Sequence, residues 1–150
     1  MAGLNERRES LEPGSLREMN KAPNERGARD RYETEIAVLK EYGLQTWAAF
    51  VLGYDYDTKA SIEETLQWAL DCKFTFGAFN VLMPYPGTSL YRRFADEDRL
   101  LYDGKWWLHP DYRFNHAAFK PRAMTADELT ELAWQCRSRF NSFGSIARRL

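Results

Sequence analysis

The segment that most constrains the fold is an apolar stretch that stops at a proline-rich turn. A strand is predicted over Thr75–Met83, and Pro84-Tyr85-Pro86-Gly87 then breaks the extended backbone. Thr88 is a good N-cap residue, so a short helix is predicted over Thr88–Glu97. A strand that leads through a tight turn into a helix is typical of α/β proteins. Ligands of such folds collect at the carboxyl ends of the strands, so the turn is a candidate site.

A second strand and its helix precede this unit. Gln45–Leu52 is nearly all apolar, as expected of a parallel strand that is buried on both faces. The polar loop Gly53–Lys59 follows it. Ser61 with Glu64 then predicts a capping box for a helix that ends near Lys73.

Helices and strands therefore alternate along this part of the chain. One more helix is predicted over about residues 29–42, and a shorter one, Leu16–Lys21, lies upstream of it. Alternating helices and strands with short connections favour a parallel sheet with right-handed crossovers. Two strands, or three with one near Glu9, are too few for a complete doubly wound fold or a closed barrel. The pattern predicts part of a larger α/β fold.

The alternation is lost in Leu100–Arg122, which combines many aromatic residues with proline, aspartate and asparagine. We expect an ordered loop that is packed on its own aromatic side chains. Thr125 with Glu128 predicts a second capping box, and a final helix runs to about Asn141. Four arginines make the C-terminal part basic, and we interpret them as a solvated helix face. They are Arg137, Arg139, Arg148 and Arg149.

Composition narrows the function classes. The 150 residues include 21 Lys and Arg against 22 Asp and Glu, a net charge of −1, which argues against nucleic acid or a membrane as a partner. The apolar runs are too short to span a bilayer, and the N-terminus lacks the apolar core of a signal peptide, so a cytoplasmic protein is predicted. Two cysteines, Cys72 and Cys136, are fewer than an iron–sulfur cluster needs, and both fall on apolar faces of predicted helices. We assign no catalytic residue and no metal ligand.

Three further patterns each have a structural and a functional interpretation. Asp55 and Asp57 could orient a hydroxyl group or hold a divalent metal, but acidic residues also favour a helix N-terminus. His109 and His116 fit no common two-histidine metal motif, so we interpret them as ordinary loop residues. The tryptophans of the loop could stack on a substrate, although burial beneath a long loop is the commoner arrangement.

Three stretches, taken together and in this order, resemble one enzyme family. They are Glu9-Ser10-Leu11, Gly53-Tyr54-Asp55-Tyr56-Asp57-Thr58 and Phe79-Asn80-Val81-Leu82-Met83-Pro84-Tyr85-Pro86-Gly87-Thr88-Ser89-Leu90-Tyr91. The chain resembles the second half of a radical S-adenosylmethionine (SAM) enzyme, in the branch that carries a cobalamin-binding domain before the radical barrel. The resemblance covers about residues 9–150.

The resemblance implies a partial parallel (β/α) barrel within the α/β class. The chain would supply roughly the fourth to the sixth strand unit, followed by the aromatic loop and a C-terminal helix. It would divide into a non-matching segment 1–8, a half barrel 9–99 and a family-specific extension 100–150. The segment Tyr102–Phe119 would close the barrel mouth or shape the substrate site.

The resemblance also implies where cofactors bind. In the family, a Cys-x3-Cys-x2-Cys loop holds a 4Fe-4S cluster, and reductive cleavage of S-adenosylmethionine yields a 5′-deoxyadenosyl radical. Residues at the ends of three strands would contact S-adenosylmethionine, and the use of cobalamin stays open. The residues are Glu9, Ser10, Leu52, Gly53, Met83, Pro84 and Tyr85.

The cluster motif itself is not in this sequence, so the chain alone is not expected to be active. One interpretation is a C-terminal fragment, whose partner is the missing N-terminal barrel half and whose parent acts on a small molecule. A second is a split enzyme, in which that half is a separate polypeptide. A third is a non-catalytic α/β nucleotide-binding or interaction module, which would be a stable monomer and bind adenosine-type ligands without iron.

Overall fold

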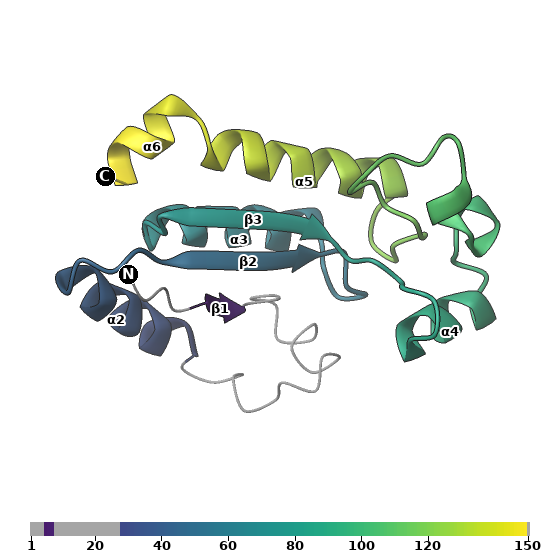
Figure 1. Cartoon of the computed structure of the whole chain (residues 1–150), viewed down its shortest axis with the longest axis horizontal. Helices are drawn as coiled ribbons and strands as arrows, with labels where there is room; N and C mark the ends of the chain where they lie inside the picture. Colours follow the sequence, from purple (N-terminus) through teal and green to yellow (C-terminus); the bar gives the residue numbers. More distant parts are fainter. Residues whose placement is uncertain (1–4, 8–27, 150) are drawn as a thin grey trace.

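The computed structural model describes residues 5–7 and 28–149, with side chains from residue 33 onward. At its centre is a sheet of three parallel strands in the order β1-β2-β3, which are β1 (Asn5–Arg7), β2 (Trp47–Leu52) and β3 (Phe76–Val81). Figure 1 shows the carboxyl ends of β2 and β3 directed toward α4 and the loop region. The predicted α/β class with parallel strands is confirmed, and within the described residues the sheet is open rather than closed into a barrel.

Five helices accompany the sheet in the described part of the chain. They are α2 (Ala28–Glu41), α3 (Lys59–Asp71), α4 (Ser89–Asp96), α5 (Ala126–Phe140) and α6 (Phe143–Arg149). The first four match the predicted helices within a few residues, whereas α6 was not predicted. It starts because Asn141 ends α5 and the Ser142 hydroxyl then accepts a hydrogen bond from the Ser145 N–H group. None of the described helices has the length and apolarity needed to cross a bilayer.

The β1 strand lies in a segment whose sequence is polar and without pattern. Asn5 pairs with Trp47 and Arg7 pairs with Ala49, both in parallel register. The strand expected near Glu9 thus lies slightly upstream, at residues 5–7, because backbone pairing with β2 rather than apolar alternation defines it. The predicted helix Leu16–Lys21 lies outside the residues that the structure describes.

The N-terminus of α3 also differs from expectation. Thr58 is the N-cap: its hydroxyl accepts from the Ser61 N–H group at 3.1 Å, and the Ser61 hydroxyl accepts from the Thr58 N–H group at 2.9 Å. The predicted capping box of Ser61 with Glu64 is therefore wrong, because two hydroxyl residues three positions apart compete for the same role. The predicted caps at Thr88 and at Thr125 are confirmed.

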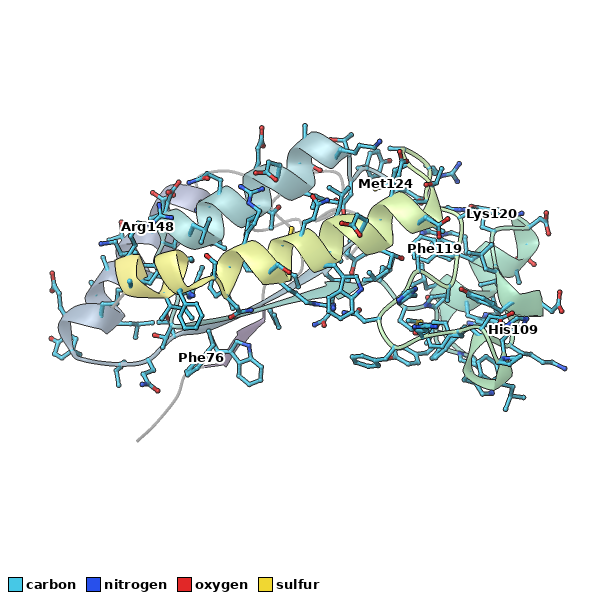
Figure 2. The ribbon with its side chains drawn as sticks, turned by 90° about the horizontal axis from the view of Figure 1, so that it is seen from above. Phe76, His109, Phe119, Lys120, Met124 and Arg148 are labelled. Carbon is cyan, nitrogen blue, oxygen red and sulfur yellow. The ribbon has the colours of Figure 1, made fainter. Side chains whose placement is uncertain are left out.

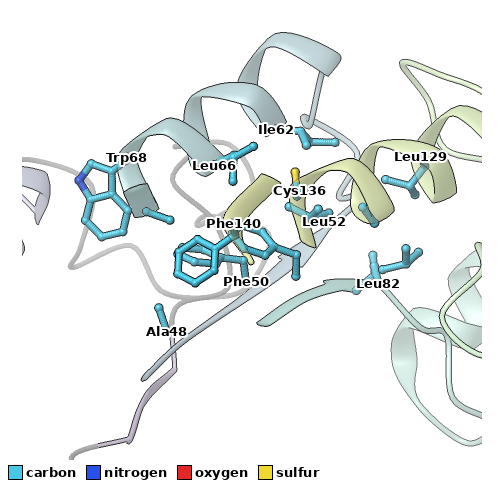
Figure 3. Close-up of a cluster of buried hydrophobic side chains, with 14 of the residues drawn as sticks. Ala48, Phe50, Leu52, Ile62, Leu66, Trp68, Leu82, Leu129, Cys136 and Phe140 are labelled. Atoms are coloured by element: carbon cyan, nitrogen blue, oxygen red, sulfur yellow. The ribbon is translucent and has the colours of Figure 1, made fainter. Parts of the chain in front are cut away.

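One face of the sheet is buried under α3 and α5. The Phe50 ring stacks on Phe79 with centroids 5.0 Å apart, and both side chains are fully buried. Trp68 of α3 meets the edge of Phe50, and Phe140 of α5 lies 5.6 Å from Phe79 (Figure 3). Burying an aromatic side chain of this kind contributes about 1.5–3 kcal/mol, so this layer is the main source of stability.

The opposite face of the sheet is partly open to solvent. It carries Trp47, Ala49, Val51, Phe76, Ala78 and Asn80. Trp47 and Phe76 are paired in register and are 52% and 54% exposed, and Figure 2 shows Phe76 directed away from α5. The expectation that Gln45–Leu52 is buried on both faces is therefore wrong for this chain. An apolar run does not show which face has a covering layer, and a parallel sheet normally has two.

The outer edge of β3 is occupied by side chains of the same chain. The N–H groups of Phe76 and of every second residue after it serve the pairing with β2, so the residues between them face outward. The Val81 N–H group donates to Asn115 Oδ1 at 2.9 Å, and the Phe79 carbonyl accepts from Arg137 Nε at 2.7 Å. These bonds use backbone groups that another strand would need.

The contact between Gly77 of β3 and Phe140 gives a stability test. A Cβ at Gly77 would lie 2.8 Å from two ring carbons of the buried Phe140, so Gly77→Ala should destabilise the fold by about 1–3 kcal/mol. Gly144→Ala is the matched control, because nothing lies within 4 Å of its added Cβ. Urea unfolding followed by circular dichroism measures both variants, and equal unfolding midpoints would contradict this account of the α5–β3 contact.

Candidate functional site

The candidate site lies where β2 and β3 end. Leu52 pairs with Val81 in register, and the Leu52 carbonyl accepts from the Leu82 N–H group at 2.8 Å. The segment after Leu52 and the segment after Leu82 therefore leave the sheet side by side. The structure thus places Leu52, Gly53, Met83, Pro84 and Tyr85 at the same edge of the sheet. The other two predicted cofactor residues, Glu9 and Ser10, lie outside the residues that the structure describes.

The turn after β2 needs a glycine and an aspartate. Gly53 has φ +105°, and a Cβ there would also collide with the side chain of Leu129. Asp57 is 4% exposed, and its Oδ2 accepts from the Gly53 N–H group at 2.8 Å and from the Tyr54 N–H group at 3.0 Å. The carboxylate of Asp57 therefore holds this turn in shape. Gly53 is buried, and the absence of a side chain there makes room for Leu129 of α5.

Asp55 lies in a cluster of arginines that the sequence did not predict. Its carboxylate oxygens are 2.7 Å from Arg99 and 3.0 Å from Arg122, with Arg93 at 3.7 Å. Burial would raise the pKa of Asp55, but the hydrogen bonds and charges of these arginines outweigh burial and lower it. Glu97 completes the network through Arg99 and Arg122.

Asp55 and Asp57 thus have structural partners rather than the metal or hydroxyl partners considered from the sequence. The described residues contain no group of three or more His, Cys, Asp and Glu placed to hold a metal ion. The two aspartates face different interactions, although they are only two positions apart in the sequence.

The turn after β3 is joined to the aromatic loop. Pro84 is buried, and its carbonyl accepts from the Trp106 indole N–H group at 3.3 Å. Tyr85 is 59% exposed, and its ring meets that of Trp106 edge-on at 5.9 Å. An antiparallel bridge between Leu100 and Phe119 closes the base of the loop. The predicted ordered loop packed on its own aromatic residues is confirmed.

Asn115 connects this loop to the end of β3, and the sequence did not single out its role. It is 5% exposed, has φ +63°, and accepts the Val81 N–H group described above. Asparagine adopts left-handed backbone more readily than other non-glycine residues, which is the one local signal that the sequence offered. The partner strand of the bond could not be inferred from the sequence.

The cysteines do not form a cluster site. Cys136 is buried, and burial raises the pKa of its thiol to about 12, so the thiol stays protonated at neutral pH. Cys72 is half-buried at the end of α3. Iron–sulfur ligation requires several thiolates placed together, which these two residues do not provide.

Two of the four C-terminal arginines are not part of a solvated face. Arg137 donates to the Phe79 carbonyl, and Arg149 donates to the carbonyls of Phe74 and Phe140 at 2.6 and 2.7 Å. The interpretation of a solvated face is wrong for these two arginines: Arg137 fixes α5 to β3, and Arg149 fixes α6 to α5 and to the segment before β3. Exposed Arg139 forms a salt bridge with Glu63.

Comparison with known proteins finds no matching family model. The chain is 28% identical over 123 residues to a bacteriochlorophyllide d C-12(1)-methyltransferase of Chlorobaculum tepidum, covering 82% of this chain and 25% of that protein. It is 30% identical over 96 residues to an anaerobic magnesium-protoporphyrin IX monomethyl ester cyclase of Cereibacter sphaeroides, covering 64% of this chain and 15% of that protein. An uncharacterized methyltransferase of Pyrococcus horikoshii is 25% identical over 97 residues, which cover 65% of this chain and 20% of that protein.

Part of the chain is therefore distantly similar to cobalamin-binding radical SAM enzymes. The resemblance inferred from the sequence is confirmed at this level. The chain spans a quarter or less of the length of each of the three relatives described.

The charge network around Asp55 gives a pH-dependent test. Asp55→Asn should destabilise the protein by about 1–3 kcal/mol at pH 7, because it leaves Arg99 without its closest carboxylate. The pKa of Asp55 is lowered in the folded state, so its contribution is present above the unfolded-state pKa and is lost as the pH falls through the folded-state value. The difference between the variant and the wild type should therefore shrink in acid. Asp111→Asn is the control, because that side chain is 84% exposed, and a loss independent of pH would contradict the charge argument.

Proposed function

We propose that this chain forms the C-terminal part of a radical SAM barrel, from about the fourth to the sixth strand, and lines the S-adenosylmethionine pocket of a larger enzyme. Distant similarity to cobalamin-binding radical SAM enzymes supports the family. The small fraction of each relative that the chain covers supports a part rather than a whole enzyme.

The observation that carries the proposal is the one-sided covering of the sheet. In a parallel barrel, helices pack on the outside, and the inner faces of the strands line the interior. β2 and β3 fit this arrangement, because their buried face lies under α3 and α5 (Figure 2), while the opposite face is partly exposed. That open face has small or apolar side chains at its centre, Ala49, Val51 and Ala78, with the polar Asn80 at its carboxyl half.

The predicted cofactor positions lie at the edge that this geometry favours, and Leu52 would contribute its backbone, because its side chain lies in the buried layer. Ligands of parallel α/β folds bind at the carboxyl ends of the strands, which is where Leu52, Gly53 and Met83–Tyr85 lie. The apolar and backbone groups of this edge would enclose the adenosyl group of S-adenosylmethionine and exclude water. Gly53 would fix the turn through its positive φ angle and so shape the wall of the pocket.

The cluster would be held elsewhere in the enzyme. Cys72 and Cys136 do not fit a 4Fe-4S cluster, so the proposal assigns the Cys-x3-Cys-x2-Cys loop to the N-terminal barrel half, encoded in the same gene or as a separate chain. When bound there, the cluster supplies the electron that cleaves S-adenosylmethionine into methionine and a 5′-deoxyadenosyl radical. Cobalamin would bind a preceding domain, and the enzyme would act on a small molecule.

The direct experiment is to sequence the coding DNA around this chain and to express the protein together with its N-terminal half. After anaerobic reconstitution we expect about four irons per complex and formation of 5′-deoxyadenosine from S-adenosylmethionine. A cysteine motif upstream in frame indicates one polypeptide, and a motif in a neighbouring gene indicates a split enzyme. The proposal fails if neither the upstream sequence in frame nor a neighbouring gene encodes a cysteine motif.

A variant on the open face tests which side of the sheet lines the pocket. Ala78→Phe adds a ring to that face without touching the buried layer, so it should leave the unfolding midpoint of this chain nearly unchanged. In the reconstituted complex it should lower 5′-deoxyadenosine formation by about tenfold or more, because the ring occupies the interior. Glu64→Phe, on the exposed surface of α3, is the control. Full activity of Ala78→Phe with normal iron content would place the pocket elsewhere.

A further inference from the structure

Aromatic rings from separate segments meet beyond the carboxyl end of β3 and form a cluster that we call the aromatic rim. The rim consists of Tyr85, Tyr102, Trp106, Trp107, His109 and Tyr112. Tyr85 comes from the turn after β3, and the other rings come from the loop before α5. Figure 2 shows the labelled His109 in this crowded region, beyond the end of the sheet.

The rings of the rim form a continuous series of contacts. His109 lies 4.8 Å from Tyr102, Tyr102 lies 5.7 Å from Tyr112, and Tyr112 lies 4.9 Å from Trp106, all between ring centroids. Trp106 in turn contacts Tyr85 at 5.9 Å and Trp107 at 5.6 Å. Six rings are joined in this way, which is more ring surface than contact with a single purine requires.

The rim is held in place rather than loosely packed. The Trp106 indole donates to the Pro84 carbonyl, and the Tyr91 hydroxyl of α4 donates to the Gly104 carbonyl at 2.8 Å. Tyr102 has φ +57° and Asp103 has φ +52°, a left-handed conformation that costs free energy for residues other than glycine. Strained backbone of this kind clusters at ligand-binding sites, where the surrounding structure maintains it.

The outer surface of the rim is not covered by the described part of the chain. Tyr85 is 59% exposed and Trp107 is 44% exposed, and the neighbouring Leu108 is 72% exposed. A group of exposed large apolar side chains on a soluble protein marks a binding surface more often than single exposed residues do. The rim also lies next to the proposed cofactor edge, through Pro84 and Tyr85.

The charged residues among these rings cancel one another. Exposed Lys105 and Arg113 are matched by exposed Asp103 and Asp111 within the same loop. The surface therefore has no excess charge that would attract an ionic ligand. Ring faces and edges are what it offers, and these favour flat conjugated ligands.

We propose that the aromatic rim is the substrate-binding platform of the enzyme and that its ligand is a flat conjugated ring system larger than adenine. This inference rests on the proposed function, because it assigns the rim to the substrate of the same site. The adenosyl group would lie at the strand ends, the substrate ring would lie against Trp107 at the mouth, and Tyr85 would stand between the two ligands.

The test is a binding titration of this chain with coproporphyrin III, a water-soluble planar macrocycle. Tryptophan fluorescence quenching and induced visible circular dichroism report the binding. Trp107→Leu keeps apolar volume but removes the ring, and it should weaken binding about tenfold or more. Trp134→Leu is the matched control, because Trp134 is 47% exposed on α5, outside the rim, and its binding should equal that of the wild type.

Several outcomes would overturn the assignment. Absence of saturable coproporphyrin binding, or equal weakening by both tryptophan variants, would show that the rim is not a specific platform. Displacement of the porphyrin by S-adenosylmethionine alone would assign the rim to the cofactor. Far-UV circular dichroism of each variant checks folding, and Tyr85→Leu provides a second variant if Trp107→Leu does not fold. A missing cysteine motif refutes the proposed function, whereas these titrations refute only the platform, so the two failures are distinguishable.

Discussion

The rest of the structure depends on the burial of a single face of its parallel sheet. Phe50 and Phe79 stack across the two central strands, and Trp68 and Phe140 press on them from α3 and α5 (Figure 3). This contact sets the register of β2 against β3 and therefore brings their carboxyl ends to one level. It also leaves the second face open. The same packing that stabilises the chain thus leaves one side of the sheet uncovered, which is the feature on which the proposed barrel rests.

Much of the element order follows from local sequence. Apolar runs and caps at Thr88 and Thr125 fixed β2, β3, α4 and α5 closely, because a cap and a change of period are short-range signals. The misses involve choices that are not local. Thr58 and Ser61 are chemically equivalent caps, β1 is defined by its neighbour, and Arg137 and Arg149 bond carbonyls far away in the chain. Contacts between residues that are distant in the sequence can be identified only once the fold is known.

The candidate site shows the same division. Strand ends were readable from the sequence, so Leu52, Gly53 and Met83–Tyr85 were placed at the correct edge, although their contact with a cofactor stays a prediction. The partners of Asp55 could not be predicted, because the sequence does not show that Arg93, Arg99 and Arg122 come together around it. The tie between Asn115 and Val81 was missed for a similar reason. A single polar side chain in a long loop does not indicate which backbone group of a strand it will hydrogen-bond.

The occupied edge of β3 has a consequence for the order in which the chain folds. Asn115 and Arg137 bond the outward groups of Val81 and Phe79, so this edge of the described sheet is closed to a further strand. Asn115 and Arg137 lie after β3 in the chain, so a ribosome exposes the strand before it exposes the residues that finish it. During synthesis β3 has a free edge until α5 emerges. Helix α5 therefore closes the edge of β3 as well as covering the core, and the interval before α5 emerges is when the nascent sheet is most open to wrong partners.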